Sequence, residues 1–522
     1  MSTHLEDLIE ALSNPGVYAH KTASVEVIQT HISVVFIAGD LVYKVKKPID
    51  LGFLDFTTLE KRRHFCRREV ILNSRFSEGV YLGVESIFRD DSGINLRGDG
   101  REIEVAVLMR RIPEECTLKW MLENDRVSEE LLDRVADRIA AIHAQARSAA
   151  DIASFGSPEV IYFNLRENFF QTEPYIGRTV DRAVYEAIST LALDFLDTHE
   201  DLFRERMKRG FTRDCHGDLH AEHVVFLDGI MLIDCIEFND RFRYSDTASD
   251  LGFLLMDLDF HGYPAFAEGV AGRYAQTSGD REILKLLGFY KSYRAFVRGK
   301  VLGFTSDETE VSDSEKQAAA ETAKLYFRLS LSYLDPPPPA LIITMGFSGT
   351  GKSYLSKRLG RRLNLDPVRS DVVRKKIFGV APDEHRLDKY GEGFYTPSAK
   401  EVTYGALFDQ ARRSLERGQS IILDASFLCF PDRQTARETA RKAGARFRMI
   451  ECVAPDEDLW QRLQRRSKDI DEPSDARWDV VVQQKEHFDP IRHEEVADCR
   501  TWDSTSDASS FLASFVRELL AT

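Results

Sequence analysis

The chain has 522 residues, of which 43% are hydrophobic and 30% are charged, and its formal net charge is −15. This length exceeds what one hydrophobic core supports, and the composition excludes both a largely disordered chain and a chain made of membrane spans. The acidic balance argues against a protein that coats nucleic acid, because phosphate binding needs a concentrated positive field.

Cysteine usage and the first residues indicate the compartment. Seven scattered cysteines, none in a CxxC pair, predict a reducing environment and no structural zinc. The N-terminal residues carry acids where a signal peptide needs bases, and no apolar run is long enough to span a bilayer. We therefore expect a cytoplasmic protein without a membrane partner.

The first part of the chain begins with strands and continues with helices. Residues 25–37 and 41–45 are predicted strands joined by a turn at 38–40, and residues 56–75 are a predicted helix. Helical runs then dominate residues 128–202. This order predicts an α+β domain.

A short segment with two aspartates carries the chemistry of this part. His216-Gly217-Asp218-Leu219-His220 precedes one apolar run, and a second apolar run ends in Asp234, so the aspartates frame a predicted hairpin. Kinases use such a pair: one aspartate accepts the hydroxyl proton, and the other holds Mg²⁺ on the nucleotide phosphates. The alternative is a structural turn with hydrogen-bonded histidines.

The segment HGDLHAEHVVF…LIDCIEF resembles the aminoglycoside phosphotransferase and choline kinase-like branch of the protein-kinase fold, whose loop is HGDxHxxN. The resemblance implies that Asp218 is the catalytic base and Asp234 a metal ligand. His223 stands where that family has a metal-binding Asn, and histidine is a poor ligand for Mg²⁺. Three interpretations stay open: Asp234 holds the ion with water, His223 supports a softer ion such as Mn²⁺, or the domain binds nucleotide without turnover.

The same resemblance requires a strand lysine for the phosphates and a helix glutamate that pairs with it. Lys44 and Lys46 project to the same side of their strand, and we favour Lys44, with Glu69 on the next helix. Residues 29–33 are expected to cover the phosphates, and backbone groups near Met109 to bind the adenine.

A proline run divides the chain. Asp335-Pro336-Pro337-Pro338-Pro339 can neither continue a helix nor donate to a sheet, so it predicts a linker between domains at residues 1–334 and 340–522. Strand-like and helical runs alternate after the prolines, which predicts an α/β domain with a parallel sheet.

The second part opens with a P-loop. Residues 346–353 match G-x-x-x-x-G-K-[ST] between a predicted strand and a predicted helix, where backbone N–H groups can surround phosphate oxygens. Lys352 is expected to reach the β and γ phosphates, and Ser353 to hold Mg²⁺. The predicted nucleotide-binding residues are Gly346, Ser348, Gly349, Thr350, Gly351, Lys352 and Ser353.

Two aspartates follow strands of this part. Asp371, with Arg374, is expected to bind or deprotonate the acceptor, and the alternative is that Ser370 and Asp371 cap a helix. Asp424 ends a strand of Walker B type and is expected to lie near Mg²⁺, with a plain strand-end aspartate as the alternative.

A cluster of arginines predicts a lid. Arg462, Arg465 and Arg466 lie on one helix and are expected to act in catalysis by closing over the transferring phosphoryl group. The alternative is a solvated basic face. Residues 467–477 are expected to form a mobile loop of this lid.

From about Ala340 onward, these motifs resemble the P-loop kinases that phosphorylate small molecules or polynucleotide 5′ ends. The whole chain resembles bacterial two-domain proteins in which an aminoglycoside phosphotransferase-like kinase domain is fused to a P-loop ATP-binding domain. That resemblance implies ATP or GTP with Mg²⁺, and a bifunctional kinase whose two domains phosphorylate hydroxyl groups of small molecules. The alternatives are an N-terminal pseudokinase that regulates the P-loop kinase, and a nucleic-acid 5′-end kinase.

Overall fold

The computed structural model describes residues 3–96, 98, 100–307, 311–380, 396–466 and 478–521. The chain divides into two compact units, Met1–Leu258 with Ala267–Leu334, and Asp259–Phe266 with Asp335–Thr522. The segment 259–266 carries no boundary signal in the sequence, and the limits 1–334 and 340–522 remain a proposal.

The first unit begins with a six-stranded antiparallel sheet that follows α1 (Thr3–Leu12). The strand order is β1-β2-β3-β6-β4-β5. The strands are β1 (Val25–Gln29), β2 (Ser33–Ala38), β3 (Leu41–Lys46), β4 (Tyr81–Asp90), β5 (Gly93–Asn95) and β6 (Arg101–Arg110). The predicted β segment 25–37 consists of two strands, and the break lies within residues 29–33, where a turn is expected to cover the phosphates; Thr30 N donates to Ser33 O across this turn at 2.9 Å.

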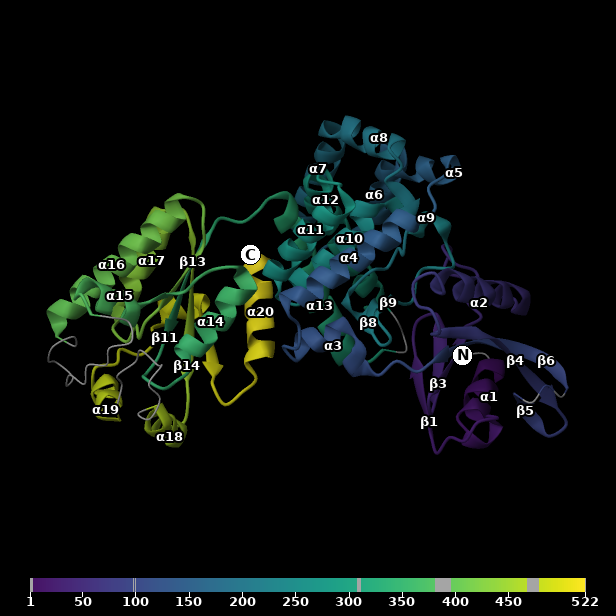
Figure 1. Ribbon diagram of the computed structural model, residues 1–522, viewed down its shortest axis with the longest axis horizontal. Coiled ribbons are helices and arrows are strands. Elements are labelled where there is room, and N and C mark those ends of the chain that lie inside the picture. The colour runs from purple at the N-terminus through teal and green to yellow at the C-terminus, as the bar shows by residue number, and fades with distance from the viewer. Residues whose placement is uncertain are drawn as a thin grey trace. The chain divides into compact units, whose positions relative to one another are not determined.

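Alternation along β2 and β3 gives this sheet two different faces. Val34, Phe36, Tyr43 and Val45 are buried in one core with the apolar side of α1. The intervening residues of β3 face the opposite side, where α2 (Leu59–Asn73) packs on the sheet (Figure 1). Lys44 and Lys46 therefore point toward α2.

Helices form the rest of the first unit and gather apart from the large sheet (Figure 1). Two small antiparallel ladders, β7 (Thr212–Asp214) with β10 (Tyr244–Asp246) and β8 (Val224–Phe226) with β9 (Ile230–Leu232), carry the loop that contains Asp218. The helices are α3 (Leu118–Glu123), α4 (Glu129–Gln145), α5 (Ala150–Ala153), α6 (Pro158–Thr172), α7 (Arg182–Thr198), α8 (Glu200–Lys208), α9 (Asp240–Arg243), α10 (Thr247–Phe260), α11 (Pro264–Ser278), α12 (Ile283–Thr305) and α13 (Asp313–Leu334). Strands followed by helices confirm the predicted α+β class.

The second unit is an α/β domain with a five-stranded parallel sheet in the order β12-β13-β11-β14-β15. Its strands are β11 (Ala340–Met345), β12 (Val368–Arg369), β13 (Ile421–Asp424), β14 (Arg446–Val453) and β15 (Cys499–Asp503). Its helices are α14 (Lys352–Leu363), α15 (Ser370–Ile377), α16 (Pro397–Glu416), α17 (Phe430–Lys442), α18 (Asp456–Arg466), α19 (Trp478–Glu486) and α20 (Ala508–Leu520). This confirms the predicted parallel sheet.

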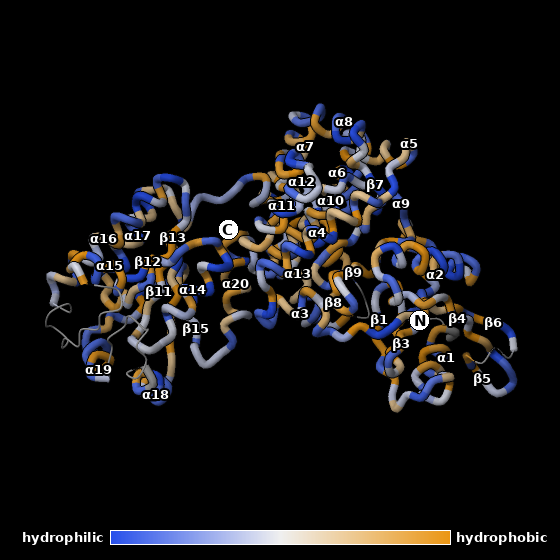
Figure 2. Tube along the Cα trace, viewed as in Figure 1, coloured by the Kyte–Doolittle hydropathy of each residue, from blue (hydrophilic) through white to orange (hydrophobic). Residues whose placement is uncertain are grey.

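Both faces of this sheet are covered, which explains the apolar runs of its strands. Leu341 and Ile343 of β11 are buried in one core with α16 and α17, whereas Ala340 and Ile342 are buried in the other with α14 and α20. Figure 2 accordingly colours β11 mostly as hydrophobic. Among the described residues, no helix is both long and apolar enough to cross a membrane.

Candidate active sites in the two domains

The loop from His216 to His220 is fixed by α10. Asp250, which is fully buried, accepts hydrogen bonds from His216 N at 3.0 Å and Gly217 N at 2.8 Å. Gly217 has φ +87°, and a Cβ there would lie 2.9 Å from Phe242 O, so the loop requires glycine at this position. The predicted catalytic residue Asp218 follows directly, with its side chain 35% exposed.

Histidines surround the Asp218 carboxylate. His220 Nε2 lies 3.7 Å from Asp218 Oδ2, and His223 Nδ1 lies 3.6 Å from the same atom. Burial would raise the pKa of Asp218, but His220, His223 and Arg298 together hold that pKa well below its usual range. Asp218 is therefore ionised and available to accept a hydrogen bond.

Asp234 and the predicted lysine meet beside this loop. Lys44 Nζ lies 2.5 Å from Asp234 Oδ1 and 3.0 Å from Glu69 Oε1, so the predicted lysine–glutamate pair forms. Burial opposes the charge on Lys44, but Asp234 and Glu69 outweigh it and raise the pKa of the amine. Asp234 has φ +60°, a strained backbone for this residue, and its N donates to Tyr81 Oη at 3.0 Å.

Lys46 has a different environment from Lys44. Its Nζ lies 2.6 Å from Glu69 Oε2 and also contacts Glu237, and only 1% of its side chain is exposed. The Lys44 side chain is 15% exposed and adjoins a carboxylate that is 42% exposed. This contrast supports Lys44 as the phosphate ligand and gives Lys46 a structural role.

The residues near Asp234 can hold a cation. His223 Nδ1 donates to Asp218 O at 2.7 Å, which leaves Nε2 unprotonated and 3.8 Å from Asp234 Oδ2. A backbone hydrogen bond of this kind fixes the ring of many metal-binding histidines. Imidazole nitrogen with carboxylate oxygen suits an ion softer than Mg²⁺, whereas Asp234 alone suits Mg²⁺.

The predicted adenine contacts lie at the end of β6. Met109 pairs with Val42 on one side and with Tyr81 on the other. The N–H groups of Arg110 and Arg111 donate to Val80 O and Asp40 O, both at 2.8 Å. These two donors are therefore occupied by the protein, and a base would need other backbone groups near Met109.

In the second domain, the P-loop joins β11 to α14 as predicted. Gly346, Gly349 and Gly351 have φ values of +135°, +90° and +89°, which residues with a side chain rarely adopt. Lys352 Nζ donates to Phe347 O at 2.7 Å, and Thr350 Oγ1 donates to the same carbonyl at 2.8 Å. Ser348 and Ser353 complete the loop, with Ser353 in the first turn of α14.

Asp424 ends β13, beside the strand that enters the P-loop. Thr344 Oγ1 donates to Asp424 Oδ1 at 3.2 Å, and the buried Oδ2 accepts no hydrogen bond from the residues that the structure describes. Arg369 Nε lies 3.5 Å from that oxygen. A buried carboxylate oxygen without a donor, together with the Ser353 hydroxyl, fits the predicted Mg²⁺ site.

Asp371 and Arg374 form a pair at the start of α15, with Arg374 Nη1 3.1 Å from Asp371 Oδ1. The alternative that Ser370 and Asp371 cap this helix is wrong, since Arg369 occupies the N-cap position and no side chain caps it. The role of Asp371 and Arg374 toward an acceptor stays a prediction.

Arg462 connects α18 to two loops of the nucleotide site. It donates to Ser504 Oγ at 2.6 Å and to Gly349 O at 3.3 Å. A cavity of about 410 Å³ lies here, lined also by Gly351 and Trp502. The side chains of Arg465 and Arg466 and residues 467–477 lie outside the described residues, so the predicted lid stays a prediction.

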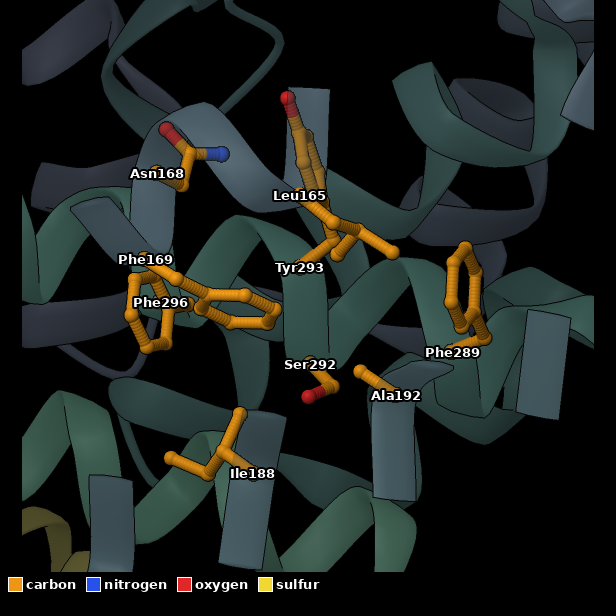
Figure 3. A pocket seen from close by; sticks show the side chains of 9 residues that line it. All are labelled: Leu165, Asn168, Phe169, Ile188, Ala192, Phe289, Ser292, Tyr293 and Phe296. Atoms are coloured by element: carbon orange, nitrogen blue, oxygen red, sulfur yellow. The ribbon is translucent and has the colours of Figure 1, made fainter. Parts of the chain in front are cut away.

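A second cavity, shown in Figure 3, lies between α6, α7 and α12 of the first unit. Its volume is about 10 Å³, and its walls are mainly aromatic and aliphatic. That volume holds one water molecule at most, so it is not a substrate site.

Several functional residues carry no motif. Glu237 follows Asp234 in the same segment. Its position after an apolar run was the only local pattern that could have pointed to it. Asp250 and Arg298 lie on helices distant in sequence from Asp218, and Trp502 and Ser504, which line the cavity beside the P-loop, follow the last strand, where no local pattern marks them.

Comparison with known proteins gives two family matches. Residues 88–287 match the phosphotransferase enzyme family, and residues 341–491 match an AAA domain. The first match begins after Lys44 and Glu69, so these two residues depend on the structure alone.

Solved structures similar to this chain include kinases. A choline/ethanolamine kinase family protein from Mesorhizobium loti is 12% identical, covers 63% of this chain and 99% of its own, and has a TM-score of 0.36. The adenylylsulfate (APS) kinase CysC of Mycobacterium tuberculosis is 18% identical, covers 36% of this chain and 100% of its own, and has a TM-score of 0.26.

Relatives that align with most of this chain occur in mycobacteria. The uncharacterized proteins Mb2027c of Mycobacterium bovis and Rv2004c of Mycobacterium tuberculosis are each 30% identical to this chain over 446 residues, or 85% of this chain and 86% of theirs. The chain therefore belongs to the family of these mycobacterial proteins, with an aminoglycoside phosphotransferase-like kinase domain followed by a P-loop kinase-like domain, and it is an ATP-dependent kinase.

Proposed function

We propose that the chain is a bifunctional kinase, in which each domain transfers the γ-phosphoryl group of ATP or GTP to a hydroxyl group of a small molecule. The observation that carries this proposal is that Asp218, Asp234 and Lys44 converge in the first domain. The second domain independently has a P-loop with Asp371 and Asp424 at the carboxyl edge of its sheet.

In the first domain, Lys44 binds the phosphates and Asp218 accepts a hydrogen bond from the acceptor hydroxyl. The acceptor oxygen bonds to the γ-phosphorus as the bond to the β-phosphate oxygen breaks, and Asp218 receives the proton. Because the pKa of Asp218 is low, its main contribution is to orient the hydroxyl, which suits a loose transition state.

In the second domain, Lys352 binds the β and γ phosphates, and the N–H groups of the P-loop surround them. Ser353 and Asp424 would hold Mg²⁺, and Asp371 orients the acceptor hydroxyl with support from Arg374. When bound, the cation neutralises charge on the phosphate oxygens. Arg462, Arg465 and Arg466 close over the phosphoryl group.

The position of His223 decides which ion we propose for the first domain. With Nε2 unprotonated and near Asp234, we propose His223 as a ligand for an ion such as Mn²⁺. Binding by Asp234 and water alone is the alternative, in which case Mg²⁺ suffices.

A pseudokinase that regulates the P-loop domain is the second candidate, and His223 in place of Asn favours it. A nucleic-acid 5′-end kinase has less support. In helix α15, Lys375 is buried and Arg374 is paired with Asp371, so these two residues do not form an exposed basic face for a nucleic acid.

Product analysis with labelled ATP and a metabolite pool tests the proposal. Asp218→Ala should remove one phosphorylated product and Lys352→Ala another, as resolved by mass spectrometry. If neither substitution removes a product, bifunctional phosphotransfer is wrong. If P-loop activity persists unchanged in Asp218→Ala and no second product exists, the pseudokinase is favoured.

The proposed location is the cytoplasm. All seven cysteines are free thiols, which suits a reducing compartment. Cell fractionation tests this location. The product-forming activity should stay in the cytosolic fraction after the membranes are removed by centrifugation.

A further inference from the structure

The segment that contains Asp234 leaves its hairpin just before the aspartate. Strand β9 ends at Leu232, and Asp234 has φ +60°, a left-handed conformation that residues other than glycine adopt only at a cost. Such a conformation persists where neighbouring groups hold it. Because the backbone conformation helps to set the direction of the side chain, the groups that hold Asp234 also direct its carboxylate.

The N–H groups of this segment show which groups hold it. Three of them donate to backbone carbonyl oxygens: Leu232 N to Phe76 O at 3.3 Å, Ile233 N to His223 O at 3.0 Å and Ile236 N to His216 O at 3.2 Å. The N–H of Asp234 donates instead to Tyr81 Oη, at 3.0 Å. The N–H of Cys235 donates to Asn73 Oδ1, at 2.8 Å. Tyr81 therefore satisfies the N–H of the strained residue itself.

The peptide group between Ile233 and Asp234 is held at its carbonyl as well as at its N–H. His216 Nε2 donates to Ile233 O at 2.8 Å. His216 Nδ1 in turn accepts a hydrogen bond from Asp218 N at 3.3 Å. A row of hydrogen bonds thus runs from the backbone of Asp218 through the His216 ring and this peptide group to Tyr81.

Tyr81 connects this row to the large sheet. It is the first residue of β4, and it is buried in one core with Val105 and Val107 of β6. Lys44 of β3, in the same sheet, lies 2.5 Å from Asp234 Oδ1. The sheet therefore contacts Asp234 twice, once at its carboxylate and once at its backbone.

The neighbouring residue stays fixed without the Tyr81 hydroxyl. Asn73, which has no exposed surface, accepts from Cys235 N and also donates to Cys235 O at 3.4 Å. Tyr81→Phe keeps the ring in its core and leaves these contacts in place. It removes only the acceptor for the N–H of Asp234, and an N–H group without an acceptor favours a different backbone conformation at that residue.

We propose that Tyr81 is a positioning residue of the first domain, which holds Asp234 in its left-handed conformation and so directs the carboxylate toward Lys44 and the metal–nucleotide complex. This inference rests on the proposed phosphotransfer, in which Asp234 is a metal ligand, and it adds a residue that acts through Asp234. A tyrosine with only a packing role would need no hydroxyl here.

Nucleotide binding with and without a metal ion tests this role in the absence of turnover. The full chain carries Lys352→Ala, and titration calorimetry measures its affinity for a non-hydrolysable ATP analogue with Mn²⁺ and with a chelator. Mn²⁺ should tighten binding to this parent chain. Tyr81→Phe should weaken binding of the Mn²⁺ complex about tenfold, as loss of a group that orients a metal ligand predicts, and should leave the metal-free affinity unchanged.

Tyr18→Phe is the matched control, because it also removes a buried tyrosine hydroxyl that binds the backbone, with Oη donating to Leu12 O at 2.5 Å. It should leave both affinities unchanged, and urea unfolding shows whether the two variants are equally folded. Equal weakening with and without Mn²⁺ in Tyr81→Phe would mean a general effect on the domain and would overturn the proposal. An unchanged affinity for the Mn²⁺ complex, or a parent chain that Mn²⁺ does not tighten, would overturn it as well.

A second experiment uses the other domain as an internal control. Products formed from labelled ATP and a metabolite pool are measured against the Mn²⁺ concentration. In Tyr81→Phe, the product that is lost on Asp218→Ala should need about tenfold more Mn²⁺ for half-maximal formation, and the product that is lost on Lys352→Ala should keep its metal dependence. An unchanged metal dependence of the first product contradicts the role of Tyr81. Absence of any product that depends on Asp218 contradicts phosphotransfer in the first domain, and the calorimetry then still decides the role of Tyr81.

Discussion

Lys44 and Lys46 show how two residues of one type on one strand take different roles. Both contact Glu69, but Lys46 is almost fully buried between Glu69 and Glu237. Lys46→Met should lower the free energy of unfolding by about 3–5 kcal/mol, because it leaves buried carboxylates without their cation. Lys44→Met should cost less stability and abolish nucleotide binding to the first domain.

Urea unfolding and nucleotide titration of the two variants, in a Lys352→Ala background, measure this difference. The outcome that contradicts it is a Lys44→Met variant that binds nucleotide normally while Lys46→Met, still folded, does not. That result would transfer the phosphate-binding role to Lys46.

His223 stands where the HGDxHxxN loop of the kinase family that this segment resembles has Asn. If its Nε2 binds the ion, Mn²⁺ bound with nucleotide in a Lys352→Ala background should show ¹⁴N coupling in pulsed EPR spectra. His223→Asn should remove the coupling and weaken Mn²⁺ binding about 10–100-fold. The same spectrum in both proteins would leave Asp234 and water as the ligands.

At the level of elements, Asp250 joins α10 to the catalytic loop and predicts a pH dependence. Burial would raise its pKa, but His143, His216 and the hydrogen bonds of the loop lower it to about 2. Because the folded-state pKa lies below the unfolded value, the stabilisation is present above about pH 4 and is lost as the pH falls toward 2. The shift corresponds to about 2 kcal/mol.

Urea unfolding of the parent chain and of Asp250→Asn between pH 5 and pH 3 tests this contribution. The difference between their free energies of unfolding should be largest at pH 5 and should shrink toward pH 3. A difference that stays constant with pH would mean that Asp250 acts through packing and not through its charge.

At the scale of the whole molecule, a site is easier to predict from sequence when its residues lie close together along the chain. The P-loop is a continuous segment after one strand, so residues 346–353 were predicted directly. Asp218 and Asp234 lie on one short hairpin, and Lys44 with Glu69 needed only strand alternation and the next helix. Each of these sites depends on local spacing.

The residues that sequence reasoning missed come from elements far along the chain. Arg294 reaches the Gly217 carbonyl, next to Asp218, through the packing of α12, and Trp502 reaches Gly351 through the position of β15 at the sheet edge. The helix-cap alternative for Asp371 was wrong because helix α15 begins one residue earlier, at Ser370. Long-range packing sets these contacts, and no local pattern encodes it.

Two units with separate cores predict two nucleotide-dependent unfolding transitions. A ligand that binds only the folded state stabilises it by RT ln(1 + [L]/Kd), about 2.7 kcal/mol when its concentration is 100 times Kd. In domains of roughly 200–300 residues, this should raise each transition temperature by several degrees. Scanning calorimetry with a non-hydrolysable ATP analogue should therefore shift both transitions.

The variants assign each shift to its site. Lys352→Ala should cancel the shift of one transition and leave the other, and Lys44→Met should do the reverse. This reciprocal pattern requires one nucleotide site in each unit, whether or not both sites turn over. If only one transition responds to the analogue in the parent chain, one domain binds no nucleotide, and both the bifunctional kinase and the nucleotide-sensing pseudokinase are wrong for that domain.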